Sequence, residues 1–102
     1  MKRALGLAVA GGILAVAASS YAVADDTAAG KAKAITCVAC HGTDGISPIE
    51  LYPNLAGQKK GYLVKQMKAF KDGSRKDPTM NAMVAALSDK DIENISAYYS
   101  KL

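Results

Sequence analysis

The chain has 102 residues, a length that fits one domain by the usual prior of roughly 100–200 residues per domain. It contains 13 basic and 9 acidic residues, which give a net charge of +4. Two of the basic residues, Lys2 and Arg3, lie in a predicted leader, and the remaining 11 basic and 9 acidic residues leave +2. A charge so small and so mixed excludes binding of nucleic acid or of another bulk polyanion as the main function.

The first 24 residues have the pattern of a secretory signal peptide. Lys2 and Arg3 precede an uncharged run from Ala4 to Ala24 that ends in Ala-Val-Ala, so a basic start, an apolar stretch and an A-x-A site follow in order. We expect cleavage after Ala24, a mature domain over residues 25–102, a periplasmic location and no stable membrane insertion. The alternative is an uncleaved anchor, because the 21 uncharged residues are enough to span a bilayer.

The mature domain is poor in large apolar side chains. Its 78 residues contain no Trp, one Phe and four Tyr. Domains of this size are marginally stable on side-chain burial alone, and they usually add disulfides, metals or cofactors. We therefore expect a cofactor in the core.

Three segments of the mature chain have helical periodicity and none alternates like a strand, which predicts an all-α fold. The first helix is expected from Thr27, as the N-cap, to about Cys40. Gly30 and Ala34 give it a narrow face. Another helix can approach closely there.

The second helix is expected from Gly61 to Asp72, with Gly73 as its C-terminal stop and a buried stripe of Leu63, Met67 and Phe70. The last helix starts at Ser88, which forms a capping box with Asp91. The apolar face predicted for that helix consists of Ile92, Ile95, Tyr99 and Leu102, bordered by Tyr98.

Two long connections join these helices, from Gly42 to Lys60 and from Ser74 to Leu87. Glycines and prolines interrupt both, so neither is predicted to be a continuous helix. Connections of this length are uncommon unless they are functional, so we expect them to wrap around the cofactor.

The strongest motif is Cys37-Val38-Ala39-Cys40-His41, which contains both cysteines and the only histidine of the chain. The CxxCH spacing is typical of covalent haem attachment. Two thiols with this spacing reach one porphyrin edge, and the next side chain points toward the iron. A thioredoxin-like pair needs a βαβ context, zinc needs four protein ligands, and a simple disulfide leaves His41 unexplained. We predict one haem c, linked to Cys37 and Cys40 with His41 as an iron ligand.

The second axial position of the iron decides between electron transfer and ligand binding. No second histidine exists, so methionine is the natural ligand, and its neutral thioether favours ferrous iron. Met67 lies on the apolar stripe of the middle helix and is interpreted as core. Met80 follows Pro78 on chain predicted to be non-helical and is the preferred ligand, and Met83 is the other candidate.

The order of these landmarks resembles a class I c-type cytochrome of the small bacterial kind, similar to one domain of the dihaem cytochrome c4 group and to its monohaem relatives. The resemblance covers Gly30 to Leu102. It implies a class I cytochrome c fold, in which three to five short helices wrap around one haem and the N- and C-terminal helices cross. The landmarks are the CxxCH-Gly segment, Asp44-Gly45, Tyr52 to Gln58, Tyr62-Leu63, Lys65 to Met67, Asp72 to Arg75, Met80, Leu87 to Asp89 and Ala97 to Tyr99.

The resemblance also implies roles for single residues. Pro53 is similar to the proline whose carbonyl accepts the Nδ1 proton of the haem histidine, and Leu55 to a leucine that packs on the haem. Gly30 and Tyr98 resemble the crossing point of the first and last helices, and the axial sulfur falls at Met80. Candidates for the neighbourhood of the haem propionates, unless they are simply solvated, are Gln58, Lys59, Lys60 and Arg75.

Together these expectations describe a soluble periplasmic one-electron carrier, monomeric and not an enzyme, whose partners are electron-donating and electron-accepting proteins. One haem is expected because the sequence contains no second CxxCH. The alternatives are a haem-based sensor of small ligands and an electron-entry subunit of a larger redox enzyme. Seven basic residues between Lys59 and Lys76 form either a docking patch for acidic partners or a solvated helix face.

Overall fold

A computed structural model describes residues 6, 11–12 and 24–102. The predicted signal peptide lies almost entirely outside the described residues, so its cleavage stays a prediction. Over residues 24–102 the longest helix has 13 residues, short of the roughly 20 that cross a bilayer. This part of the chain is helical without strands, and its elements are α1 (Thr27–Lys33), the 3₁₀ helix η1 (Ala34–Cys37), α2 (Val38–His41), α3 (Lys60–Asp72), α4 (Pro78–Val84) and α5 (Asp89–Ser100).

The first helical segment differs from the prediction at its start and in its middle. Asp26 is the N-cap, since its side chain accepts a hydrogen bond of 2.9 Å from the Ala29 amide, and Thr27 is already helical. After Lys33 the chain tightens into η1 and then forms one turn of α2. A 3₁₀ helix has three residues per turn, so η1 rotates the residues that follow relative to α1.

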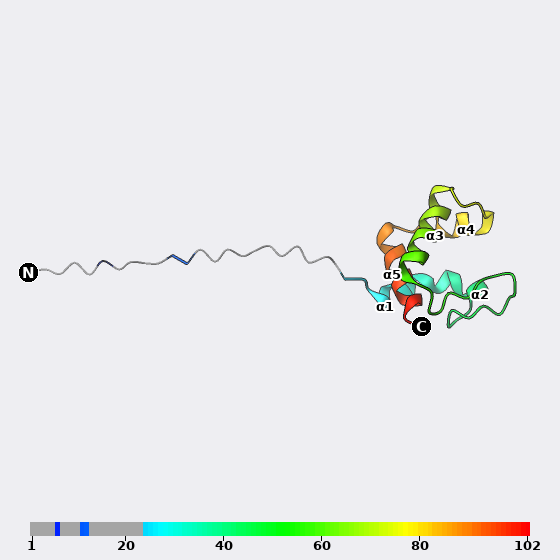
Figure 1. The fold of residues 1–102 in the computed structure, drawn as a ribbon, viewed down its shortest axis with the longest axis horizontal. Helices are drawn as coiled ribbons and strands as arrows, with labels where there is room; N and C mark the ends of the chain where they lie inside the picture. Colours follow the sequence, from blue (N-terminus) through cyan, green and yellow to red (C-terminus); the bar gives the residue numbers. More distant parts are fainter. Residues whose placement is uncertain (1–5, 7–10, 13–23) are drawn as a thin grey trace, which may run out of the picture.

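The crossing of α1 and α5 is confirmed, and it brings two backbones into direct contact (Figure 1). A Cβ atom at Gly30 would lie 2.0 Å from the Asn94 carbonyl oxygen and 3.0 Å from the Ile95 nitrogen. The Asn94 side chain also accepts a hydrogen bond of 2.9 Å from the Asp26 amide. The atoms nearest a Cβ at Gly30 are therefore backbone atoms of α5, and Tyr98 of the same helix packs against the core cluster that includes Ala34.

The predicted apolar face of the last helix is buried except at its end. Ile92, Ile95 and Tyr99 are each at most 1% exposed. The predicted capping box of Ser88 is present in full. Leu102, however, is 48% exposed, because α5 ends at Ser100 and the helical spacing does not reach it.

The middle helix, α3, agrees with its prediction to within one residue. It begins at Lys60 and ends at Asp72, and Gly73, with a φ of +81°, forms the left-handed C-cap. Leu63 and Phe70 are buried, and Met67 packs half-buried against the core cluster. α3 contacts both α5 and α4, so it joins the crossing to the second connection.

The second connection contains a helix that the sequence analysis did not predict. Pro78 occupies the first turn of α4, where its missing N–H has no partner to lose, and Asp77 caps the helix by accepting from the Met80 amide at 3.0 Å. The proline therefore starts a helix instead of preventing one. Met80, expected on non-helical chain, is helical.

Asp25, the first residue after the predicted cleavage position, forms ion pairs with the folded domain. Asp25 pairs with the Lys60 ammonium of α3 and lies 3.6 Å from Lys90 of α5, and Lys60 lies 3.1 Å from Glu93. The hydrogen bond from Lys60 lowers the pKa of the Asp25 carboxyl. The start of the predicted mature chain is thus held against α3 and α5.

We expect Gly30→Ala to reduce the free energy of unfolding by about 1–3 kcal/mol, because its methyl group overlaps the Asn94 carbonyl and forces α1 and α5 apart. Gly61→Ala is the matched control, since a Cβ at Gly61 in α3 meets nothing within 4 Å. It should leave stability unchanged or raise it by up to about 1 kcal/mol. Guanidinium denaturation measures both, and equal midpoints would contradict the close crossing.

Candidate functional site

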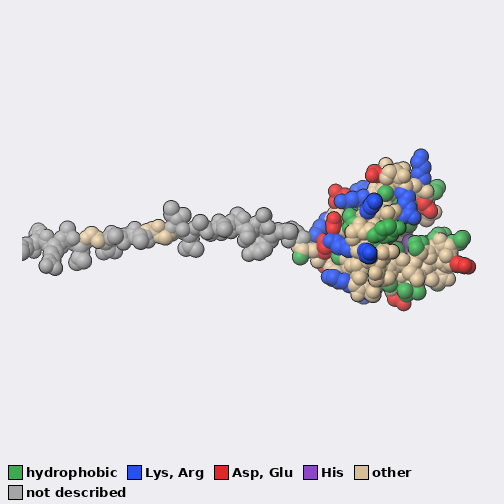
Figure 2. Space-filling model, viewed as in Figure 1, with side chains coloured by type: hydrophobic (Ala, Val, Ile, Leu, Met, Phe, Trp, Pro, Cys, Tyr) green, Lys and Arg blue, Asp and Glu red, His purple; other side chains and the backbone are tan. Residues whose placement is uncertain are grey.

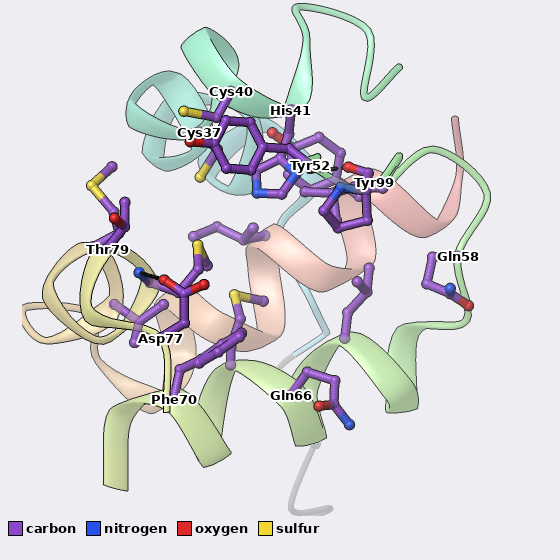
Figure 3. Close-up of a pocket in the computed structure, with 18 of the residues that line it drawn as sticks. Cys37, Cys40, His41, Tyr52, Gln58, Gln66, Phe70, Asp77, Thr79 and Tyr99 are labelled. Carbon is purple, nitrogen blue, oxygen red and sulfur yellow. Dashed lines mark hydrogen bonds between the residues drawn. The ribbon is translucent and has the colours of Figure 1, made fainter. Parts of the chain in front are cut away.

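A cavity of about 390 Å³ opens between α2 on one side and α3 and α4 on the other (Figure 3). This volume is within the range of about 300–1,000 Å³ typical of small-molecule sites. Its walls are mainly apolar and aromatic. All six predicted site residues line it, namely Cys37, Cys40, His41, Pro53, Leu55 and Met80.

The two cysteines lie at the same wall because of the local helix geometry. Cys37 is the last residue of η1 and Cys40 lies in the single turn of α2, so both thiols face the cavity and both are free. Figure 3 shows both side chains beside His41. Burial raises the pKa of the Cys37 thiol above its ordinary value.

His41 is oriented by the backbone of the first connection. Its Nδ1 atom lies 2.8 Å from the Pro53 carbonyl oxygen, the contact that the resemblance implied. The side chain is 7% exposed. A carbonyl is only an acceptor, so this contact requires Nδ1 to carry the proton and leaves Nε2 with a free lone pair. The imidazole is thus prepared to bind a metal through Nε2.

The first connection folds tightly to bring Pro53 to His41. Gly42 has a φ of +88°, and a Cβ there would lie 1.9 Å from the Ile46 carbonyl oxygen, so only glycine fits this turn. The Ser47 hydroxyl then donates to the Cys40 carbonyl at 2.9 Å, and the Asn54 side chain accepts from the Ser47 amide at 2.7 Å. These bonds place the loop against the CxxCH segment.

The other walls come from α3, α4 and α5. Leu63, Met67 and Phe70 of α3 line the cavity, so the stripe predicted as core also forms its floor. On α4, Met80 is half-buried and Met83 is 41% exposed, and both line the cavity. Their spacing of three residues places them on one face of α4.

Asn81 is a supporting residue that the sequence analysis missed. Its amide nitrogen donates to the carbonyls of Phe70 and Arg75, at 2.7 and 2.9 Å, and its oxygen accepts from the Asp77 amide at 2.9 Å. It therefore ties α4, and Met80 with it, to the end of α3. The N-cap signal of Asp77 before Pro78 was available in the sequence, but the partners of Asn81 are carbonyls that only the fold brings together.

The four propionate candidates separate into two groups. Gln58 and Arg75 line the cavity, and Arg75 is held there by a 2.7 Å hydrogen bond to Gln66 and by stacking 4.4 Å above the Phe70 ring. Lys59 does not line the cavity, and Lys60 is paired with Asp25. Only Gln58 and Arg75 are positioned to meet a bound group.

Two buried hydroxyls in α5 have no hydrogen-bond partner among the described residues, those of Ser96 and Tyr99. Tyr99 lines the cavity and Ser96 does not. Burial, with the nearby Cys37 thiol as a second cause, raises the pKa of Tyr99, although geometry gives its hydroxyl no partner. An orphaned donor at the wall of an apolar cavity indicates that a bound group completes the site.

The family model of cytochrome c matches residues 27–102. The chain belongs to the cytochrome c family. Cytochrome c-554(548) of Halomonas halodenitrificans is 52% identical over 80 residues, which cover 76% of this chain and 96% of that protein. Cytochrome c4 of Pseudomonas aeruginosa is 51% identical over 77 residues, or 76% of this chain and 38% of that protein.

Solved structures agree with this assignment. The crystal structure of reduced recombinant cytochrome c4 from Pseudomonas stutzeri has a TM-score of 0.71 and 45% identity, and the match covers 76% of this chain and 45% of that one. The predicted class I cytochrome c fold is therefore confirmed.

As a cytochrome c, the chain binds haem c covalently, and Cys37 and Cys40 supply the CxxCH thiols. The cavity fits this group, with two thiols and an oriented imidazole at one apolar wall.

We expect Asn81→Ala to reduce the free energy of unfolding by about 1–3 kcal/mol, since two carbonyls and one amide lose their partner. Asn81→Asp keeps the acceptor and the shape but loses both donated bonds, so it should also destabilise. Ala82→Gln, on the exposed side of α4, is the control. Hydrogen exchange should localise the effect to α4 amides. Unchanged exchange there would contradict the role of Asn81.

Proposed function

We propose that this cytochrome c is a periplasmic one-electron carrier whose haem iron is ligated by His41 and Met80. The observation that carries the proposal is the placement of an oriented imidazole on one wall of the cavity and a half-buried thioether on another. Two protein ligands leave no open position for a substrate. When bound, haem c supplies the iron that changes oxidation state, and no side chain need act as acid, base or nucleophile.

His41 supports this role through its hydrogen bond to Pro53. The bond fixes the tautomer and the ring orientation, and it increases the basicity of Nε2. Because the ring is held in one orientation, it does not need to move when the iron changes oxidation state. The reorganisation energy of electron transfer is therefore small. The apolar walls exclude water from the site, which also favours the form of lower charge.

Three observations favour Met80 over Met83 as the second ligand. Met80 is half-buried, whereas Met83 is 41% exposed. The Met80 amide is held by the side chain of Asp77 at 3.0 Å. The residue that follows it, Asn81, is hydrogen-bonded to the end of α3. A side chain on so constrained a turn reaches a fixed point in the cavity.

The relatives favour proteins as donor and acceptor. One of them is named a thiosulfate dehydrogenase electron acceptor, from Thiomonas intermedia, and it is 38% identical over 103 residues that cover all of this chain and 45% of that protein. We infer that this cytochrome likewise accepts an electron from a redox enzyme and passes it on.

A second candidate is an electron-entry subunit of a larger enzyme. It is favoured by the thiosulfate dehydrogenase structure from Marichromatium purpuratum, which matches 76% of this chain but only 19% of its own length, with 32% identity and a TM-score of 0.71. Such a domain therefore occurs within a larger redox protein. The size of the native cytochrome on gel filtration separates the two candidates.

Four lysines are available for docking. Of the seven basic residues between Lys59 and Lys76, three already have partners inside the domain, through Asp25, Leu87 and Gln66. The exposed ones without an ion pair among the described residues are Lys59, Lys65, Lys68 and Lys76. Figure 2 shows basic side chains around α3 and α4, whereas residues 42–58 are mostly uncharged. We infer that the α3 side attracts acidic partner surfaces.

We expect Met80→Ala to abolish the far-red absorption band that arises from sulfur-to-iron charge transfer in the ferric protein. The ferrous variant should bind carbon monoxide, because one axial position is open. Met83→Ala is the matched control on the same face of α4 and should keep the band. Persistence of the band in Met80→Ala and its loss in Met83→Ala would move the ligand to Met83. Absence of the band in the wild-type protein would favour a ligand-binding sensor instead.

We expect electron transfer to a purified acidic redox protein to slow steeply as ionic strength rises, because screening weakens attraction between exposed charges. The double variant Lys65→Glu, Lys68→Glu should slow the reaction at low salt. Lys31→Glu reverses an exposed charge in α1 in the same sense and is the control. It should lower the rate much less for each charge reversed. A rate independent of salt would rule out docking through the lysines of α3.

A further inference from the structure

The hydroxyl of Tyr99 is buried in a way that packing alone does not explain. The side chain is 1% exposed, and its oxygen has no hydrogen-bond partner among the described residues. A buried hydroxyl without a partner destabilises the fold, and a phenylalanine at this position would avoid that cost. The rest of the ring is closely packed, with the Tyr98 ring centroid 5.1 Å away. The hydroxyl therefore points to an interaction that the polypeptide alone does not supply.

The surroundings of Tyr99 narrow the choice of partner. It reaches the cavity from α5, on the side where Cys37 and His41 lie (Figure 3). Cys37 packs against the buried cluster that contains Tyr99, and both side chains line the cavity, so the Cys37 sulfur is a near neighbour of the ring. Haem c brings two kinds of acceptor, the propionates and the thioether sulfurs. The propionates leave the macrocycle on the edge opposite the vinyl-derived links, away from Cys37.

Attachment of haem changes what the Cys37 sulfur can do. A free thiol has an S–H that competes as a weak donor, whereas a thioether has lone pairs and no hydrogen. Adding the S–H bond across a haem vinyl group moves the thiol hydrogen to carbon and forms the new C–S bond, so no other reagent is consumed. The sulfur then becomes an acceptor only, beside a donor that lacks a partner.

We propose that Tyr99 is a positioning residue whose phenol donates a hydrogen bond to the thioether sulfur at Cys37 and so holds the attached edge of the haem. The bond draws electron density from the macrocycle, which favours ferrous iron and raises the reduction potential. The proposal rests on haem attachment at Cys37 and not on the identity of the distal ligand. It can therefore fail while the His41 and Met80 assignment stands.

Tyr99→Phe in the haem-loaded protein tests the proposal, because it removes only the oxygen. We expect a lower reduction potential and a lower denaturant midpoint than in the wild-type protein. In resonance Raman spectra, one thioether C–S stretching band should shift in D₂O in the wild-type protein, because the donated proton exchanges. That sensitivity should disappear in Tyr99→Phe, while the sulfur-to-iron band of the distal ligand should persist.

Two controls come from the same helix. Ser96→Ala removes the other orphaned hydroxyl, which is 0% exposed but does not line the cavity, so it should leave the potential unchanged and keep or raise stability. Tyr98→Phe removes a neighbouring phenol outside the cavity wall and should keep the D₂O shift. If Tyr99→Phe behaves like Ser96→Ala, with unchanged potential, no D₂O-sensitive band in the wild-type protein and no loss of stability, the proposal is wrong.

Discussion

The backbone contact between α1 and α5 at Gly30 is the constraint on which the remaining geometry depends. The CxxCH segment follows α1 without a flexible linker, so the direction of α1 fixes the wall that holds both thiols and His41. α5 carries Tyr99 to the same cavity, and α3 packs against α5. Because the two backbones are this close, any side chain larger than a hydrogen atom at Gly30 pushes α1 and α5 apart. The cavity walls that these helices carry would then no longer contact the same flat cofactor.

The two sides of the cavity are supported by different means. On the CxxCH side, short-range sequence sets the geometry, and a single carbonyl, that of Pro53, orients His41. On the α4 side, no covalent link is available, so Met80 depends on side-chain hydrogen bonds that tie its helix to α3. The second arrangement is easier to disturb without unfolding the domain. With Met80 as the proposed distal ligand, variation in axial ligation should therefore arise first through α4 and not through the CxxCH motif.

Much of this architecture could be predicted from the sequence, because it depends on local chemistry. The CxxCH spacing, the stripe of α3 and the capping box of Ser88 are each encoded within a few residues. α4 was missed because Pro78 has two opposite local meanings, helix breaker and first-turn residue, and only the docking of Asn81 on α3 decides between them. Leu102 was misplaced because periodicity does not state where a helix stops. Likewise, no pattern distinguishes the orphaned hydroxyl of Tyr99 from a satisfied one.

The distribution of charge separates control of the iron from control of the partner. The cavity wall is largely apolar, and Arg75, which lines it, is hydrogen-bonded to Gln66 and stacked on the Phe70 ring. The potential therefore depends mainly on the axial ligands, on burial and on hydrogen bonds near the haem. Lys65 and Lys68 of α3, which have no ion pair among the described residues, lie on the exterior, where charges are screened within about 10 Å at ordinary ionic strength. A change of surface charge can thus alter which proteins dock without resetting the potential, so partner choice and redox poise can vary independently on one scaffold.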